Sequence, residues 1–314
     1  MNRENHLRTA YITHTDCRNH DTGPGHPEHA GRLYAIEDQF VASGLDSVLR
    51  YVDAPLASDE QLLRVHSREY VETIRAAIPV SGYARLDPDT VIGPESLNAA
   101  YRAAGSVVAA VDLIMRGEME SAFCGVRPPG HHAESSRSMG FCLFDNIAVG
   151  AAHALETYGL DRVAIVDFDV HHGNGTEDIF QNESRILFCS AFEHPFYPFT
   201  PLLENTATRI SVPLPATAKS DEFQAAVTDQ WLPALEAFQP EMIFVSAGFD
   251  AHRDDDMSHV SLTDADFKWV SERIVEIANQ FASGRIVSVL EGGYELKSLA
   301  RCVETHIRVL MGLH

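Results

Sequence analysis

The stretch Val166-Asp-Phe-Asp-Val-His-His-Gly-Asn-Gly-Thr176 determines how the rest of this 314-residue chain is interpreted. It continues the apolar run that begins at Val163 and ends in a glycine-rich turn. A short apolar run that ends in carboxylates is typical of a buried parallel strand with polar groups at its C-terminal end. Side chains alternate along a strand, so we expect Asp167, Asp169 and His171 to share one face.

Two of these side chains suit a divalent metal. Asp169 and His171 offer an oxygen and a nitrogen ligand, the types that zinc accepts in proteins. Asp167 would then be free to orient a neighbouring group. The alternative is that the polar residues only cap the helix that follows the strand.

The composition limits the class of protein. The chain has 24 Lys and Arg against 45 Asp and Glu, a formal net charge of −21. Such a charge disfavours nucleic acid and favours cationic ligands such as lysine-rich tails or polyamines, unless it serves only solubility or a saline habitat. No apolar run approaches the roughly 20 residues that cross a bilayer, and Met1–His6 does not resemble a secretory signal. The 5 cysteines are scattered without CxxC pairing, which favours a reduced, cytoplasmic protein.

Strand-like and helix-like segments alternate along most of the chain. We expect strands at Arg8–Thr13, Ser47–Val52, Ser121–Val126, Val163–Val166, Arg185–Ala191, Thr208–Leu214, Met242–Ala247 and Arg285–Leu290. We expect helices at Pro27–Ser43, Asp59–Val65, Ser67–Ala77, Glu95–Met115, Asp145–Tyr158, Asp221–Phe238, Thr263–Ala282 and Glu295–Leu313, and long loops at His14–Pro27 and Pro79–Pro94. This alternation predicts an α/β fold with a parallel sheet flanked by helices. We see no repeat or linker, so residues 1–314 are expected to form one domain.

Unusual polar clusters follow four of the predicted strands. They are Gly130-His131-His132, the stretch ending at Thr176, Gly248-Phe-Asp-Ala-His252 and Glu291-Gly-Gly-Tyr294. In open α/β sheets, ligands bind at the carboxyl ends of the strands. Four clusters at one edge therefore predict a single site.

The clusters supply the parts of a metal-assisted hydrolase. Asp250 is the best third metal ligand, because a catalytic zinc keeps three protein ligands and one open position; it could instead cap a helix. His131 and His132 follow Pro-Pro-Gly and suit a general base and acid for an activated water. Such histidines need partners at the far nitrogen, and Asp167 fits His131 while Asn174 fits His132. The alternative is that this pair has no catalytic role.

Tyr294 follows two glycines and could place its hydroxyl beside the metal. Hydrolysis of an amide builds negative charge on the carbonyl oxygen, which a phenol and a metal together would stabilise. Most tyrosines after Gly-Gly only pack in the core, so this assignment depends on the neighbouring clusters.

These motifs, read together, resemble a known family. Arg127-Pro-Pro-Gly-His-His-Ala-Glu134, Gly140-Phe-Cys142, Asp167–Thr176, Ala247-Gly-Phe-Asp-Ala-His252 and Leu290-Glu-Gly-Gly-Tyr294 occur in the order seen in zinc-dependent histone deacetylases. The chain is most similar to the class II branch and to bacterial deacetylase-like and acetylpolyamine amidohydrolases. The resemblance implies the arginase–deacetylase fold and a catalytic Zn²⁺ held by Asp169, His171 and Asp250. It also implies His131 and His132 as the acid–base pair, and Tyr294 as the group that polarises the carbonyl.

The resemblance further implies a tunnel with aromatic walls for an acyl-lysine stem. Gly140 and Phe141 match one wall, and Tyr197 the other, where phenylalanine is usual and Phe196 is the alternative. The matching rim position falls on the apolar Met257, beside Asp254, Asp255 and Asp256. Glu95 matches a loop position that contacts the substrate backbone.

The family also binds structural potassium. Matching positions for one K⁺ are Asp167, Asp169, His171, Ser190 and Ala191. A second K⁺ would use backbone near Phe180, Glu183 and Ile186. Oxygen cages of this kind suit hard cations.

Two substrates are consistent with the resemblance, an acetylated lysine in a protein or peptide and an acetylated polyamine. An acidic gatekeeper at the rim would favour the polyamine, whereas Met257 favours acyl-lysine. A catalytically inactive relative that binds acetylated ligands is the alternative from another class. The sequence leaves open the acyl length, zinc or ferrous iron as native metal, the oligomeric state and the role of residues 14–27.

Overall fold

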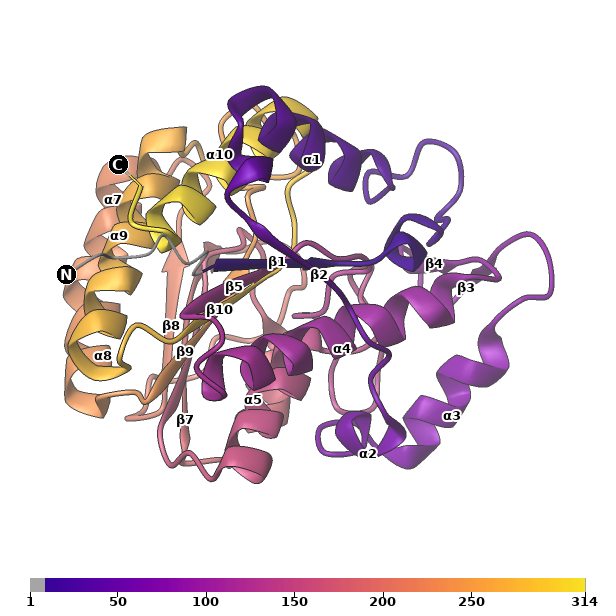
Figure 1. Ribbon diagram of the computed structural model, residues 1–314, viewed down its shortest axis with the longest axis horizontal. Helices are drawn as coiled ribbons and strands as arrows, with labels where there is room; N and C mark the ends of the chain where they lie inside the picture. Colours follow the sequence, from indigo (N-terminus) through magenta and orange to yellow (C-terminus); the bar gives the residue numbers. More distant parts are fainter. Residues whose placement is uncertain (1–8, 314) are drawn as a thin grey trace.

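The computed structural model describes residues 9–313. The described part therefore leaves out residues 1–8 and His314, and with them the segment Met1–His6 and Arg8, the predicted start of the first strand. Its centre is an eight-stranded sheet in the order β2-β1-β5-β10-β9-β6-β7-β8 (Figure 1). Every neighbouring pair in this sheet is parallel. The strands are β1 (Thr9–Thr13), β2 (Arg50–Asp53), β5 (Ser121–Cys124), β6 (Val163–Asp167), β7 (Ile186–Glu193), β8 (Arg209–Leu214), β9 (Met242–Ala247) and β10 (Ile286–Leu290). The prediction of a parallel α/β fold is confirmed.

Helices cover both faces of the sheet (Figure 1). On one face α10 (Leu296–Leu310) packs against α1 (Gly31–Ser43) and α9 (Asp264–Phe281). On the other face α4 (Ser96–Met115) packs against α5 (Asn146–Tyr158). The shorter helices are α2 (Asp59–Leu62), α3 (Arg68–Ala77), α6 (Asn174–Phe180), α7 (Ser220–Ala226) and α8 (Leu232–Phe238). Among the described residues, no helix has the length and apolarity required to traverse a bilayer.

The central strands are continuous apolar runs in the sequence because both faces of the sheet are buried. Every residue of β5, β6, β7, β9 and β10 is buried, as expected for parallel strands under two helical layers. The Ala-rich helices α4 and α5 allow close packing on this sheet. At the start of α5, the Asp145 carboxylate accepts a hydrogen bond from the Ala148 amide at 2.9 Å, an N-cap that satisfies an otherwise free donor.

The four strands with polar clusters are neighbours, in the order β5-β10-β9-β6. Their registers align the ends, with Cys124 opposite Val289, Leu290 opposite Ala247 and Ser246 opposite Asp167. The segments after these strands therefore meet at one edge of the sheet, as predicted.

One prediction about this edge is wrong. Strand β6 ends at Asp167, so Asp169 and His171 do not continue its face. The amide of Asp169 donates to the Asp167 carboxylate at 3.1 Å, and the amide of His171 donates to that of Asp169 at 2.8 Å. Aspartate side chains that bond the backbone two residues on turn the chain. Two successive turns of this kind, in place of strand pleating, bring Asp169 and His171 close to Asp250.

Other boundaries also differ from the predictions. Residues Leu45–Ser47 form a 3₁₀ turn, so the second strand begins at Arg50. The predicted loop 79–94 contains a hairpin of β3 (Ala84–Arg85) and β4 (Val91–Ile92). The helix predicted at 221–238 contains a π-helical segment, Val227–Trp231, between α7 and α8.

Candidate active site

The centre of the site is a cluster of three buried side chains. The ligand atoms of Asp169, His171 and Asp250 all lie within 4.8 Å of one another. His171 Nδ1 lies 3.1 Å from Asp169 Oδ1 and 3.1 Å from Asp250 Oδ2. The structure thus brings the predicted third ligand, from the loop after β9, to the two ligands after β6.

Backbone groups orient both carboxylates. The Gly292 amide donates to Asp169 Oδ2 at 2.8 Å, and the Val170 amide donates to Asp250 Oδ1 at 3.0 Å. Gly292 also has to be glycine, because a Cβ there would lie 2.1 Å from Asp250 Oδ2. The loop after β10 therefore approaches the cluster as closely as its backbone allows.

The charges of the cluster suit a cation. Burial and then the nearby Asp169 carboxylate raise the pKa of Asp250 to about 6. Burial opposes a charge on His171 as well, but Asp250 and Asp169 outweigh it and raise its pKa to about 10. Two carboxylates that together hold a proton on an imidazole would exchange it for a divalent ion, since ligands bind metals in their deprotonated forms.

His131 and His132 lie beside the cluster with different partners. His131 Nδ1 is 3.0 Å from Asp167 Oδ2, and His132 Nδ1 is 2.8 Å from Asn174 Oδ1. Their rings are 4.0 Å apart between centroids. Both predicted partners are therefore present.

The two imidazoles differ in basicity. Burial disfavours the charged form of His131, but the carboxylates of Asp167 and Asp169 outweigh it and raise the pKa well above the usual value. Burial and the neighbouring His131 and His171 hold the pKa of His132 well below it. Because like charges this close cannot both form, the pair carries one proton more readily than two.

Asn174 also determines the tautomer of His132. Its amide nitrogen donates to Glu134 Oε1 at 2.9 Å, so its oxygen faces the imidazole. His132 Nδ1 then donates to that oxygen, and Nε2 is left with a free lone pair. Glu134, part of the Pro-Pro-Gly-His-His-Ala-Glu motif, thus has a role that sequence reasoning did not assign.

Tyr294 lines a pocket of about 270 Å³ that leads to this cluster. The pocket is lined by Asp89, His132, Gly140, Phe141, His171, Phe196, Tyr197, Met257 and Tyr294. The rings of Phe141 and Tyr294 meet edge to face at 5.9 Å. The Arg32 guanidinium lies 5.0 Å from the centroid of the Tyr294 ring, and its Nε donates to the Gly293 carbonyl at 2.6 Å. These contacts hold the tyrosine at the pocket wall.

Comparisons with known proteins agree with this geometry. Residues 26–310 match the model of the histone deacetylase domain. The chain belongs to the histone deacetylase family. It is 35% identical to the histone deacetylase-like amidohydrolase of Pseudomonas aeruginosa, over 98% of this chain and 87% of that protein. It is 32% identical to Type-2 histone deacetylase 2 of Dictyostelium discoideum over 98% of this chain, which spans only 21% of that protein.

Solved structures give the same relationship. The crystal structure of the HDA15 HD domain superimposes with a TM-score of 0.92 and 31% identity, covering 98% of this chain and 90% of that one. The chain is therefore a hydrolase of the histone deacetylase family, with the fold of that family. The family is generally zinc-dependent, and the described residues include a cluster suited to a metal.

Both aromatic alternatives on the second wall of this histone deacetylase pocket line it. Phe196 stacks on His171 with ring centroids 5.6 Å apart, and Tyr197 meets His132 edge to face at 5.3 Å. The Tyr197 hydroxyl is buried and has no hydrogen-bond partner among the described residues. On the first wall, Phe141 is held by a hydrogen bond from its amide to Thr90 Oγ1 at 3.1 Å. The predicted 14–27 loop reaches this wall, since His26 packs on Phe141 at 4.7 Å.

The rim differs in part from the predictions. Met257 lines the pocket, but Glu95 is an exposed residue that precedes α4 and does not. The acid that lines the pocket is Asp89, which sequence reasoning missed. Its signal was its place in a long loop rich in Gly, Pro and Asp, because such loops are often functional.

None of the three acids before Met257 lines the pocket. Asp255 is buried and turns inward, where its carboxylate accepts the amides of Tyr294 and Glu295 at 2.6 and 3.0 Å. Asp254 and Asp256 are exposed. Asp255 therefore orients the backbone of the loop that carries Tyr294.

Glu291 is a second buried acid that sequence reasoning singled out without a role. Its Oε2 accepts the amides of Gly130 and His131 at 2.7 and 3.2 Å, and Oε1 accepts Ser246 Oγ at 3.2 Å. Burial raises its pKa to about 7. One side chain thus ties together the ends of β5, β9 and β10.

The residues expected to bind the first potassium lie together at the end of β6. Ser190 pairs with Asp167 across the β6–β7 register. Its buried hydroxyl has no partner in the described part of the chain, as a cation ligand would. Asp169 and His171 follow in the turns after β6, and Ala191 follows Ser190 in β7.

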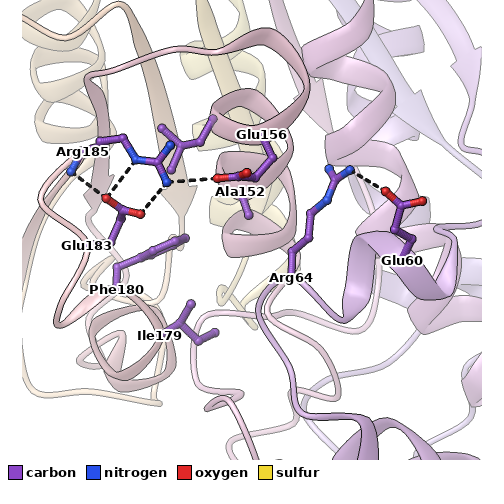
Figure 2. A pocket seen from close by; sticks show the side chains of 9 residues that line it. Glu60, Arg64, Ala152, Glu156, Ile179, Phe180, Glu183 and Arg185 are labelled. Atoms are coloured by element: carbon purple, nitrogen blue, oxygen red, sulfur yellow. Dashed lines mark hydrogen bonds and ion pairs between the residues drawn. The ribbon is translucent and has the colours of Figure 1, made fainter.

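Two of the three residues expected near a second potassium, Phe180 and Glu183, line the surface cavity of Figure 2, whereas Ile186 does not. This cavity of about 600 Å³ is lined by Phe180 and Glu183 together with paired charges. The Glu183 carboxylate accepts Arg185 Nε at 3.0 Å and Nη2 at 2.7 Å. The Phe180 carbonyl accepts the Glu183 amide at 3.0 Å. Among the described residues that line this cavity, no buried side-chain nitrogen or oxygen lacks a hydrogen-bond partner in the way that Ser190 does.

Proposed function

We propose that this protein is a zinc-dependent deacetylase that removes acetyl groups from the ε-amine of acyl-lysine in proteins or peptides. The observation that carries the proposal is the cluster of Asp169, His171 and Asp250 beside an asymmetric histidine pair, at the base of a pocket with aromatic walls.

The donor set fits zinc, because one imidazole and two carboxylates would balance the charge of a divalent ion. Asp169, His171 and Asp250 would hold it. Bound zinc would polarise the substrate carbonyl and lower the pKa of a water. The same set accommodates ferrous iron, so metal analysis belongs to any activity test.

The histidine pair divides the proton transfers. His132 Nε2, with its lone pair free and its pKa low, suits acceptance of the proton from the attacking water. His131, held by Asp167 at Nδ1, carries a proton that its Nε2 can donate to the leaving amine. Amide cleavage needs a proton at that nitrogen, because an amide anion is a poor leaving group.

The pocket walls account for the substrate. Tyr294 would donate its hydroxyl proton to the carbonyl oxygen as negative charge develops there. Phe141 and Tyr197 would pack on the methylenes of the lysine stem. The second wall includes Phe196, which stacks on the ligand His171.

Potassium is part of the same proposal. Its strongest support is the orphaned Ser190 hydroxyl, with Asp167 opposite. A monovalent ion there would stiffen the turn that carries Asp169 and His171. The second potassium site has weaker support, since its polar groups are already paired.

An acetylated polyamine is the second candidate substrate. The Asp89 carboxylate in the pocket lining favours it, because a polyamine carries further ammonium groups beyond the acetylated nitrogen. The apolar Met257, also in the lining, favours the acyl-lysine stem.

A substrate panel tests the proposal. Turnover of an acetyl-lysine peptide, N-acetylputrescine and N8-acetylspermidine is measured with and without a chelator. We expect chelator-sensitive turnover that is restored by Zn²⁺ and highest in kcat/KM on the peptide. No chelator-sensitive turnover of any substrate would favour an inactive relative that only binds acetylated ligands.

A further inference from the structure

We propose that a cavity beside the acyl-lysine pocket binds a basic residue, Lys or Arg, that flanks the acyl-lysine in the substrate chain. This inference rests on the proposed function and names the substrate class more closely. The cavity measures about 510 Å³ and is formed by α3, the β3–β4 turn and residues 136–139.

The cavity adjoins the acyl-lysine pocket, and this position indicates which part of a substrate would occupy it. Asp89 and Tyr197 line both the cavity and the acyl-lysine pocket. They form the wall between the two spaces. A peptide with its acyl-lysine in the pocket would therefore place an adjacent side chain over the cavity, whereas a compact acetylated amine would not reach it.

The lining suits a side chain with an apolar stem. The lining of the cavity includes the apolar side chains of Tyr70 and Ile74 from α3 and those of Leu86 and Met139. Thr73 lies at the exposed edge. Methylenes of a Lys or Arg stem would pack on these apolar groups while the charged head stays near water.

The carboxylates of Asp87 and Asp89 at this wall would attract a positively charged group. Asp87 Oδ1 accepts the amides of Asp89 and Thr90 at 3.0 and 2.6 Å, which holds the two acids side by side. Burial and then the adjacent Asp87 raise the pKa of Asp89 to about 6. Of the described ion pairs none includes either acid. Arg137, the basic residue of the lining, is paired with Glu134 at 2.7 Å.

An unpaired hydroxyl supports a polar contact at the same wall. The Tyr197 hydroxyl is buried and makes no direct hydrogen bond in the described part of the chain, although burial and then the Asp89 carboxylate beside it raise its pKa. A buried hydroxyl that lacks a partner is unfavourable, so a ligand group that bonds to it would gain free energy. The two carboxylates already accept the amides of Asp89 and Thr90 and the Thr90 hydroxyl. A guanidinium or ammonium at this wall would add a positive charge beside them and a donor to the Tyr197 oxygen.

Peptide kinetics test the inference. Three acetyl-lysine peptides that carry Arg, Gln or Glu next to the acetyl-lysine, on either side in turn, are compared by kcat/KM. We expect the Arg peptide to exceed the Gln peptide by about tenfold on one side, with the Glu peptide lowest, as for a half-buried charged hydrogen bond.

Two variants remove the preference by different routes. Asp87→Asn keeps the turn, because the amide oxygen can still accept both amides, and it should bring the Arg-to-Gln ratio close to one. Thr73→Lys places a cation at the cavity edge and should reduce or invert the ratio. Glu72→Gln, a change of one exposed charge on the same helix outside the cavity, is the matched control and should leave the ratio unchanged.

The outcomes separate this inference from the proposed function. Equal kcat/KM for the Arg, Gln and Glu peptides, or an Arg preference that persists in both cavity variants, would overturn the subsite while deacetylation stands. A preference for a bulky apolar neighbour that is insensitive to Asp87→Asn would overturn its cationic character. Absence of chelator-sensitive turnover on every peptide would instead contradict the proposed function.

Discussion

At the scale of single residues, two adjacent histidines differ in basicity because the side chains that they hydrogen-bond differ by one non-hydrogen atom. His131 faces a carboxylate and His132 faces an amide. The carboxylate stabilises an imidazolium, whereas the amide orients the ring without adding charge. In the proposed mechanism, the protein would obtain an acid and a base from the same residue type because His131 and His132 have the different partners Asp167 and Asn174.

Asn174→Asp tests this difference. A carboxylate opposite His132 Nδ1 would raise the pKa of that imidazole, so more of it would be protonated at neutral pH and unable to accept a proton. We expect kcat/KM at pH 7 to fall by about 10²-fold and the acidic limb of its pH profile to move to higher pH. A profile with an unmoved limb would show that His132 is not the base.

Tyr294→Phe removes one hydroxyl and keeps the ring contacts with Phe141 and Arg32. If the hydroxyl stabilises the developing oxyanion, kcat should fall by about 10²- to 10³-fold. The zinc content per chain should not change, because the tyrosine is not one of the three clustered ligands. Steady-state kinetics with metal analysis of the same preparation check both expectations, and an unchanged kcat would contradict the role.

At the scale of elements, the site is built by the loops that follow the strands, more than by the strands themselves. The loop after β10 supplies a carboxylate to the loop after β5 through Glu291, and an amide to Asp169 through Gly292. Cross-links of this kind keep the ends of separate strands close to the Asp169–His171–Asp250 cluster.

Glu291 offers a stability test of these links. Glu291→Ala would leave the buried amides of Gly130 and His131 without an acceptor, which we expect to lower the free energy of unfolding by roughly 3 kcal/mol. Glu291→Gln should lower it much less, because the amide oxygen can accept both bonds. Urea unfolding of the two variants checks this, and equal losses would mean that packing rather than hydrogen bonding matters there.

Gly292→Ala probes the close approach at the metal cluster. The added Cβ would lie 2.1 Å from Asp250 Oδ2 and 2.6 Å from Asp169 Oδ2, so the carboxylates must move and zinc per chain should fall. Gly117→Ala is the control, since that Cβ meets nothing within 4 Å although φ is +71°. The control should lose stability and retain zinc; a full zinc content in Gly292→Ala would contradict the expected displacement.

At the scale of the whole molecule, much of this architecture followed from the sequence. The alternation of apolar runs with Ala-rich helices predicted the parallel sheet, and four polar clusters at strand ends predicted one site, because parallel strands share an edge. What the pattern could not supply were contacts between segments distant in sequence. The positions of Asp89 in the pocket lining and of Asp255 next to the Tyr294 loop depend on how loops fold over that edge. The hydrophobic periodicity of a segment does not predict such loop conformations.

Buried histidines make the stability of the molecule depend on pH. Burial lowers the pKa of His66 to about 4, while its Nε2 accepts the Asp145 amide at 2.9 Å. The unfolded chain binds a proton near pH 6.5, so this stability is present above that pH and is lost as pH falls toward 4, by roughly 3 kcal/mol. His66→Gln should flatten the pH dependence of urea unfolding between pH 6.5 and 5; an unchanged slope would contradict it.

The position of β10 has a consequence for biosynthesis. Strand β10, the last strand among the described residues, does not lie at an edge but inserts between β5 and β9. Glu291, Gly292 and Tyr294 follow directly after it. A nascent chain that has emerged from the ribosome only as far as β9 holds Asp169, His171 and Asp250 on one half-sheet, after β6 and β9, and holds His131 and His132 on the other, after β5. If the proposed function holds, the histidine pair would therefore meet the three clustered residues only once β10 has joined the two half-sheets, so the acid–base pair would be in place later than the metal ligands.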